Sequence, residues 1–174
     1  MADPHRDLAP SPWVARFAAL VPAGGAVLDV AAGGGRHTRL FLGRGHPVVA
    51  VDRDTKGLAE LEPSLGLEIV TADLEAASWP LPGRKFAGVV VTNYLHRPLF
   101  PALLAAVVPG GAFVYETFAA GNERFGKPSN PDFLLRPGEL LETVRGRLRV
   151  IAYEDVEVAE PRPAMVQRIA AVAA

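Results

Sequence analysis

The sequence predicts a doubly wound α/β fold, with a mostly parallel sheet that ends in an antiparallel hairpin. Five short apolar runs alternate with helical segments, which is typical of a parallel sheet buried on both faces. In the last third, two extended segments flank a short proline-containing loop, and strands joined so closely must run antiparallel. The five runs are Ala26–Val30, Pro47–Val51, Leu67–Val70, Phe86–Val91 and Gly111–Tyr115, and the extended segments are Leu148–Val158 and Met165–Val172.

The segments between the apolar runs predict the helices. Ser11 offers an N-cap, and Pro12 follows at the first helical position. Trp13, Phe17 and Leu20 then recur at helical spacing. Further helical segments are predicted at Arg36–Leu42, Thr55–Leu61, Pro98–Val108 and Pro137–Val144, with a loop around Ser78–Gly83.

Length and composition indicate one globular domain. The chain has 174 residues, 49% of them hydrophobic, and a formal net charge of −1. These values exclude a coiled coil, a fibre and a disordered tail, and they provide no basic footprint for nucleic-acid binding. We expect a flexible N-terminal tail at residues 1–10 and a single domain at residues 11–174.

Residue types that the sequence lacks narrow the chemistry further. There is no cysteine, which excludes disulfides, thiolate metal sites and a cysteine nucleophile. The chain has no apolar run of the ~18 residues that a membrane span needs, and no secretory signal pattern. We therefore expect a cytoplasmic protein with no metal site.

A glycine-rich loop follows the first predicted strand. In residues 27–40, VLDVAAGGGRHTRL, the strand ends at Asp29, three glycines follow at 33–35, and a helix begins. Glycines let the backbone approach a ligand closely, and a helix start leaves N–H groups free for an anionic group. The dinucleotide pattern GxGxxG fits poorly, because its sixth position is Thr38. Alone, such a triplet is as often an ordinary tight turn.

Acidic residues end three successive predicted strands. They are Asp29, Asp52 and Asp73, and Asp52 lies 19 positions after Gly33. Ligands of open α/β sheets bind at this edge, and an acid about 20 positions beyond the glycines is placed to bind ribose hydroxyls. The three acids together indicate a nucleoside cofactor. An ionised Asp29 would repel a pyrophosphate but attract an ammonium group, which favours S-adenosylmethionine over NAD.

On these residues the chain resembles the class I S-adenosylmethionine-dependent methyltransferases, over nearly its whole length. Within that family it is similar to the small, single-domain tellurite-resistance type. The acidic-x-Gly-x-Gly-x-Gly loop of the family appears at residues 29–35, with Ala31 in place of the first glycine. The resemblance implies a seven-stranded sheet, S-adenosyl-L-methionine as cofactor and S-adenosyl-L-homocysteine as product. It also implies that the 29–35 loop, with Ala31, Gly33 and Gly35, surrounds the methionine part, and that Asp29 acts on its amino group directly or through water.

The resemblance implies roles for the other cofactor-binding residues. Asp52 would hold the ribose hydroxyls, and Arg53 beside it is included in the site. Asp73 would accept a hydrogen bond from the adenine amino group, while the N–H of Leu74 faces the ring. Asn93 matches a position near the methionine amino group.

Candidate catalytic residues follow the fourth and fifth predicted strands. Methyl transfer from a sulfonium is an in-line displacement, so aligning the acceptor and excluding water are the main tasks. His96 is a candidate general base because a histidine pKa lies near neutrality; alternatively it caps the helix starting at Pro98 or packs against a neighbour. Tyr94 either shapes the methyl pocket or is a rim aromatic.

Two more features concern the acceptor. Glu116 either orients an amine or hydroxyl acceptor or pairs with an arginine of the long loop that follows. That polar stretch, residues 116–136, is a candidate lid. Its Phe118, Phe125 and Phe133 would either close over the substrate or anchor the loop to the core.

We predict an S-adenosylmethionine-dependent methyltransferase that acts on a small-molecule or soft-nucleophile acceptor, as a monomer or homodimer without membrane association. An RNA (tRNA or rRNA) methyltransferase is the main alternative. It is suggested by Asn93-Tyr94, which lacks the two prolines of the Asn-Pro-Pro-Tyr signature, and by several arginines near the last helix. A non-catalytic nucleoside-binding protein and a nicotinamide-dependent dehydrogenase are weaker alternatives. The arginines near the last helix that suggest the RNA alternative are Arg136, Arg145, Arg147 and Arg149.

Overall fold

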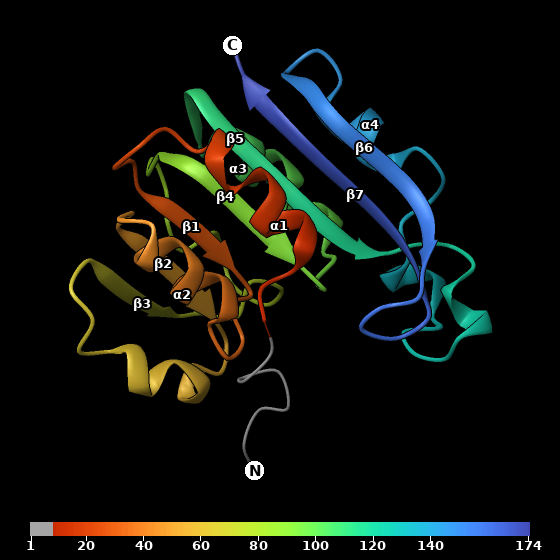
Figure 1. Ribbon diagram of the computed structural model, residues 1–174, viewed down its shortest axis with the longest axis horizontal. Coiled ribbons are helices and arrows are strands. Elements are labelled where there is room, and N and C mark those ends of the chain that lie inside the picture. The colour runs from red at the N-terminus through yellow and green to blue at the C-terminus, as the bar shows by residue number, and fades with distance from the viewer. Residues whose placement is uncertain (1–8) are drawn as a thin grey trace.

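The computed structural model describes residues 9–174, so most of the predicted N-terminal tail lies outside the described residues. A seven-stranded sheet has the order β3-β2-β1-β4-β5-β7-β6 (Figure 1). Neighbouring strands pair in parallel from β3 to β5, whereas β7 pairs antiparallel with both β5 and β6. The predicted parallel sheet with a C-terminal antiparallel hairpin is confirmed. The strands are β1 (Val27–Val30), β2 (Val48–Asp52), β3 (Leu67–Thr71), β4 (Phe86–Thr92), β5 (Val107–Phe118), β6 (Leu148–Val158) and β7 (Ala164–Ala173).

Helices cover both faces of the sheet (Figure 1). Helices α1 and α2 lie on one face, where Trp13 and Phe41 are buried in one apolar cluster. Helices α3 and α4 lie on the other, where Leu103 and Leu140 belong to the largest cluster. The α-helices are α1 (Pro12–Phe17), α2 (Arg36–Gly43), α3 (Phe100–Ala105) and α4 (Glu139–Val144), and 3-10 helices lie at Ala18–Leu20, Lys56–Leu61, Arg97–Leu99, Asn122–Arg124 and Pro131–Phe133.

The start of α1 confirms the predicted cap. The Ser11 hydroxyl accepts hydrogen bonds from the N–H groups of Trp13 (3.2 Å) and Val14 (3.4 Å). These bonds satisfy backbone donors that have no partner inside the helix. Helix α1 is shorter than the apolar spacing suggests, because the chain tightens into a 3-10 turn at Ala18 and leaves Leu20 partly exposed.

The predicted boundary before β5 is wrong. The sequence suggested a helix up to Val108, but α3 ends at Ala105 and β5 begins at Val107. Val107 pairs with Phe86 of β4, and a register shift follows before Gly88. Side chains branched at Cβ favour extended backbone, and the pairing with β4 extends the strand toward its N-terminus.

The carboxyl ends of β1 to β5 lie along one edge of the sheet, because these five strands are parallel. The antiparallel hairpin of β6 and β7 then brings residues near Val158 and Ala164 to the same side, next to the end of β5 (Figure 1). Within residues 9–174 no helix is long and apolar enough to span a membrane.

Candidate active site and cofactor cleft

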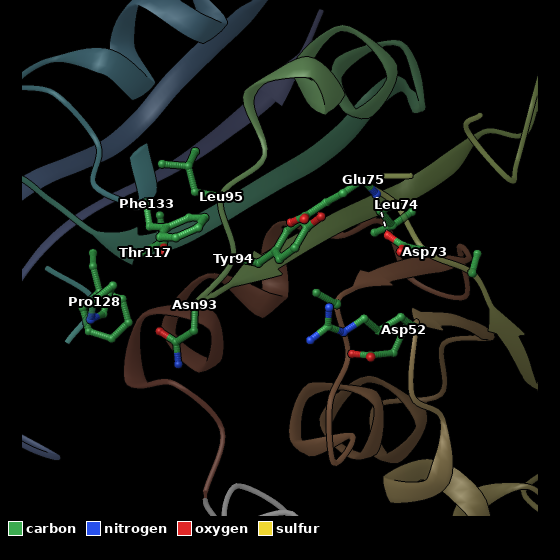
Figure 2. A pocket seen from close by; sticks show the side chains of 14 residues that line it. Asp52, Asp73, Leu74, Glu75, Asn93, Tyr94, Leu95, Thr117, Pro128 and Phe133 are labelled. Carbon is green, nitrogen blue, oxygen red and sulfur yellow. Dashed lines mark hydrogen bonds between the residues drawn. The ribbon is translucent and has the colours of Figure 1, made fainter. Parts of the chain in front are cut away.

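A cleft of about 530 Å³ lies along the carboxyl edge of the sheet. Small-ligand sites commonly have volumes of roughly 300–1,000 Å³. The cleft brings together six of the nine predicted cofactor-binding residues, whereas Asp29, Gly33 and Gly35 are not part of its wall. The lining residues, many of them drawn in Figure 2, are Ala31, Asp52, Arg53, Ala72, Asp73, Leu74, Glu75, Asn93, Tyr94, Leu95, Thr117, Phe118, Pro128 and Phe133.

Asp52 links the end of β2 to the glycine loop. Its Oδ2 accepts a hydrogen bond from the Gly33 N–H (2.8 Å), and its Oδ1 accepts one from the Asp54 N–H (3.0 Å). A carboxylate retains further acceptor capacity when each oxygen has one donor. Asp52 therefore orders the loop and can still accept hydrogen bonds from a ligand in the cleft.

The glycine loop contains one position, Gly35, where any side chain would be strained. Gly35 has φ +81°, and a Cβ there would lie 2.8 Å from methyl carbons of Leu58 and Leu61. Ala31, which replaces the first glycine of the pattern, has φ 53°. In the described chain, Ala31 and Asn93 (φ 52°) are the non-glycine residues with positive φ, and both line the cleft. Strained backbone of this kind often gathers at ligand sites.

Asp29 lies behind the loop, outside the wall of the cleft. It is 2% exposed and accepts a 2.7 Å hydrogen bond from the Thr38 hydroxyl of α2. Burial raises its pKa from 3.8 to about 6, against the opposing effect of the Thr38 bonds. Sequence reasoning noted Thr38 only as a misfit to the dinucleotide pattern, and missed that its hydroxyl is the partner of Asp29.

Asp73 caps the turn that follows β3. Its Oδ1 accepts hydrogen bonds from the N–H groups of Glu75 (2.9 Å) and Ala76 (3.2 Å), and these bonds hold its pKa below the usual value. The N–H of Leu74 donates to no acceptor among residues 9–174. The turn thus presents one free carboxylate oxygen and one free N–H to the cleft.

Two candidate catalytic residues lie on the segment after β4. Tyr94 lines the cleft, and burial together with the neighbouring Glu75 carboxylate raises its pKa, so its hydroxyl stays protonated at neutral pH. His96 is not in the cleft wall. It is the N-cap residue of the 3-10 helix Arg97–Leu99, where its carbonyl accepts from the Leu99 N–H (3.0 Å) and its side chain makes no capping bond.

Glu116, the third catalytic candidate, faces a second cavity of about 300 Å³. This cavity shares Asn93 and Phe118 with the cleft. Glu116 accepts hydrogen bonds from the Ser11 hydroxyl (2.6 Å) and from the Arg168 guanidinium (3.0 Å). The expected alternative, an arginine of the long loop, is wrong, because Arg168 lies directly opposite Glu116 in the β5–β7 register.

The phenylalanines of the 116–136 stretch differ in position. Phe118 and Phe133 line the cleft, and Phe133 is 50% exposed. Phe125 lines neither cavity and lies under the Arg124 guanidinium, 5.1 Å from the ring centre. None of the three is fully buried, so these rings are not core anchors.

The arginine run near α4 is partly neutralised. Arg136 pairs with Glu139, and Arg145 pairs with Glu142 at 2.6 Å. The run therefore does not present four free cations. Among residues 9–174, no group of three histidine, aspartate or glutamate side chains is arranged to hold a metal ion.

The sheet order is that of the class I methyltransferase fold, and the glycine loop after β1 and the acids after β2 and β3 lie at the carboxyl edge of its strands. Residues 27–111 match the family described as "Methyltransferase domain". Together with the fold, this match makes the chain similar to the class I S-adenosylmethionine-dependent methyltransferases. No curated protein matches the chain by sequence.

Solved structures share this fold at low sequence identity. TehB from Haemophilus influenzae superposes with a TM-score of 0.74 at 17% identity, over 92% of this chain and 61% of that one, so this chain spans about three fifths of TehB. The 1,6-didemethyltoxoflavin-N1-methyltransferase of Burkholderia thailandensis gives 0.68 at 21% identity, over 98% and 79%. The glycopeptide N-methyltransferase MtfA gives 0.64 at 22%, over 97% and 93%.

These neighbours agree with the cofactor predicted from the sequence. The toxoflavin-type enzyme and MtfA were both crystallised with S-adenosylhomocysteine, and MtfA also with sinefungin. S-adenosylhomocysteine, present in both structures, is the product form of the cofactor predicted from the sequence.

Proposed function

We propose that the cleft binds S-adenosylmethionine and that the protein transfers its methyl group to a small-molecule acceptor. One observation carries the proposal: Asp52 and Asp73, identified from their spacing, line a single cleft with Leu74. Asp52 would accept from the ribose hydroxyls, and the free oxygen of Asp73 from the adenine amino group. The unpartnered N–H of Leu74 supplies the donor that a ring nitrogen needs.

The methionine end of the cofactor would lie near Ala31 and Asn93. Both residues line the cleft in left-handed backbone conformations, and Asn93 also lines the second cavity. The Asp29 carboxylate lies behind the glycine loop, where its negative charge favours an ammonium group on the other side. An effect through the loop or through water fits the burial of Asp29 better than a direct contact.

When bound, S-adenosylmethionine supplies an electrophilic methyl group on a sulfonium. The task of this chain is to align an acceptor with that group and to keep water away. Tyr94 would form the wall between the nucleoside and the acceptor, and its protonated hydroxyl is not a base at neutral pH. Glu116 is ion-paired with Arg168, so it would orient an acceptor from the second cavity rather than remove its proton.

His96 remains the candidate general base, although it lies outside the cleft wall. Its imidazole is near enough to Asp73 to help lower the pKa of that carboxylate. Because His96 is not in the cleft wall and lies on the side of Asp73, it would reach an acceptor only through a chain of water molecules. An acceptor that needs no proton removal would not use it.

The acceptors named for two structural neighbours support a small-molecule acceptor. One neighbour is a glycopeptide N-methyltransferase, and another is a 1,6-didemethyltoxoflavin-N1-methyltransferase with that compound bound. In this chain, the part of the cleft beyond Asn93 and Tyr94 is lined by side chains from the end of β5 and from the segment that follows it.

Isothermal titration with S-adenosylhomocysteine, with NAD as the control ligand, tests the proposal. We expect a dissociation constant in the micromolar range, about −8 kcal/mol, and no binding of NAD. Binding of NAD without S-adenosylhomocysteine would overturn the cofactor assignment. An acceptor screen with S-adenosylmethionine then tests transfer itself, and cofactor binding without turnover on any acceptor would favour a non-catalytic protein.

A further inference from the structure

The cleft has a charged half and an uncharged half, which meet at Asn93 and Tyr94 (Figure 2). Asp52 and Asp73 lie in the charged half, where the proposed function places the nucleoside. On the other side of Tyr94 is a region without any ionisable side chain, which we call the apolar half. It is formed by Leu95, Thr117, Phe118, Pro128 and Phe133.

A buried asparagine fixes one part of the apolar half. Asn122 is 2% exposed, and its amide group donates a 2.9 Å hydrogen bond to the Pro128 carbonyl. Its Oδ1 accepts a 3.1 Å bond from the Met165 N–H at the start of β7. Pro128 is thus tied to the sheet through one satisfied side chain, and its place in the wall is set by β7.

An arginine fixes the other part. Arg97, just after β4, donates to the carbonyl oxygens of Asp132 and Leu134, each at 2.9 Å, on either side of Phe133. The same guanidinium makes a two-pronged ion pair with Glu139 of α4, at 2.6 and 3.0 Å. A guanidinium bound at so many points is rigid, so the backbone that carries Phe133 is held in place.

This fixed wall holds an aromatic ring that the protein itself leaves half uncovered. Phe133 is 50% exposed although its ring lines the cleft. Covering apolar surface is favourable, and aromatic rings gain further from stacked or edge-on contacts with other rings. Bringing a charge against the same wall is costly, because no side chain there can pair with it.

The second cavity provides the contrast. It is lined by Arg36, Glu116 and Arg168, together with further charged residues of the β6–β7 hairpin. A charged acceptor would therefore be held there rather than in the apolar half. The cleft and this second cavity share Asn93 and Phe118 in their walls.

We infer that the methyl acceptor is an uncharged, flat aromatic or heteroaromatic molecule that binds in the apolar half against Phe133. The inference rests on the proposed function, because it takes the charged half to be filled by the cofactor. It adds a substrate class and names Phe133 as the residue that selects for it.

Three probes with the same ring system test the inference: indole, which is neutral, indole-3-acetate, which is anionic, and tryptamine, which is cationic. Each is titrated into protein saturated with S-adenosylhomocysteine, and binding is followed by ligand-observed saturation-transfer NMR. We expect indole to bind at least about tenfold more tightly than either charged probe. Phe133→Ala should weaken indole binding at least about fivefold, and Phe133→Leu by less, because leucine keeps apolar contact but loses the flat ring.

Phe125→Ala is the matched control, since Phe125 lies on the same segment but lines neither cavity. It should leave indole binding unchanged, and all three variants should keep the cofactor affinity of the original protein. Equal or tighter binding of a charged probe, no binding of indole, or no effect of Phe133→Ala would overturn the inference. Failure of the unmodified protein to bind S-adenosylhomocysteine, measured beforehand, would instead refute the proposed function.

Discussion

The hydroxyl of Tyr115 donates a 2.6 Å hydrogen bond to the backbone carbonyl of Tyr94. Tyr115 lies in β5, is 1% exposed, and has the rings of Phe100 and Phe113 within 6 Å. Its burial raises the pKa of the phenol, so the hydroxyl is a permanent donor at neutral pH. A core side chain thereby fixes the segment after β4 that carries the middle of the cleft.

Tyr115→Phe should weaken both the fold and the site. The change leaves a part-buried carbonyl without its donor, so we expect about 1–2 kcal/mol of lost stability in urea unfolding. Affinity for S-adenosylhomocysteine should fall by a few-fold, since the position of Tyr94 relaxes. Tyr153→Phe is the control, because Tyr153 lies in β6 and does not line the cleft. Equal cofactor affinities in the two variants would contradict a positioning role for Tyr115.

Asp52→Ala should weaken cofactor binding by about 1–3 kcal/mol, because hydrogen bonds to the ligand and to the glycine loop are both lost. Isothermal titration with S-adenosylhomocysteine measures the change. The neighbouring Asp54→Ala removes a carboxylate that is not in the cleft wall and only accepts from the Lys56 N–H. It should bind nearly as the original protein does. An unchanged affinity for Asp52→Ala would remove Asp52 from the site.

Asp29→Asn should change how stability depends on pH. Because the folded pKa is about 6 and the ordinary value is 3.8, Asp29 favours the folded state most below pH 4, and this contribution is lost as pH rises through 6. By the linkage relation, the raised pKa lowers the free energy of unfolding at pH 7 by about 3 kcal/mol relative to its value at low pH. Asparagine is neutral and can still accept from Thr38.

The variant should therefore lose less stability than the original protein between pH 4 and pH 7. Urea unfolding at several pH values measures the difference, with Asp54→Asn as an exposed control. Parallel pH profiles for Asp29→Asn and the original protein would show that the carboxylate titrates normally. Cofactor affinity should fall at neutral pH, where the charge behind the loop is lost.

Gly35→Ala and Ala31→Gly should have opposite consequences. A Cβ at Gly35 would clash with Leu58 and Leu61 and sit at φ +81°, so we expect a loss of about 2 kcal/mol or more in thermal or urea unfolding, with weaker cofactor binding. Ala31 already occupies φ 53°, and glycine would relieve about 1 kcal/mol of strain while adding flexibility to the unfolded chain. The net change should be within about 0.5 kcal/mol. Similar losses in both variants would argue against this account of the loop.

His96→Ala should separate binding from chemistry. Because His96 is outside the cleft wall, affinity for S-adenosylhomocysteine should persist. If His96 removes a proton through water, turnover should fall about 100-fold and the acidic limb of its pH profile should disappear. His96→Asn keeps a polar side chain without the titration and serves as the comparison. Full turnover with an unaltered pH profile would assign His96 to structure alone.

The strands and the acids that line the cleft were predictable because their signals are local. An apolar run between turn residues predicts a strand, and the last residue of the run predicts which side chain lies at the carboxyl edge of the sheet. For β2, the strand ends at Asp52, and Asp52 lines the cleft. The failures arose where tertiary pairing overrides local pattern. Val107 belongs to β5 because it pairs with Phe86 of β4. Glu116 forms an ion pair with Arg168 because β7 lies beside β5 in the sheet.

The sequence by itself determined the alternation of strands and helices, the hairpin, the glycine loop and the spacing of Asp52 and Asp73. Those features depend on backbone preference and on the period of apolar residues, which neighbouring positions reveal. Only the tertiary structure decided that Asp29 lies behind the loop, and that Arg97 holds the backbone of Phe133 at the uncharged end of the cleft. These contacts join residues tens of positions apart, and no local pattern specifies which side chains meet when the sheet brings its strand ends together.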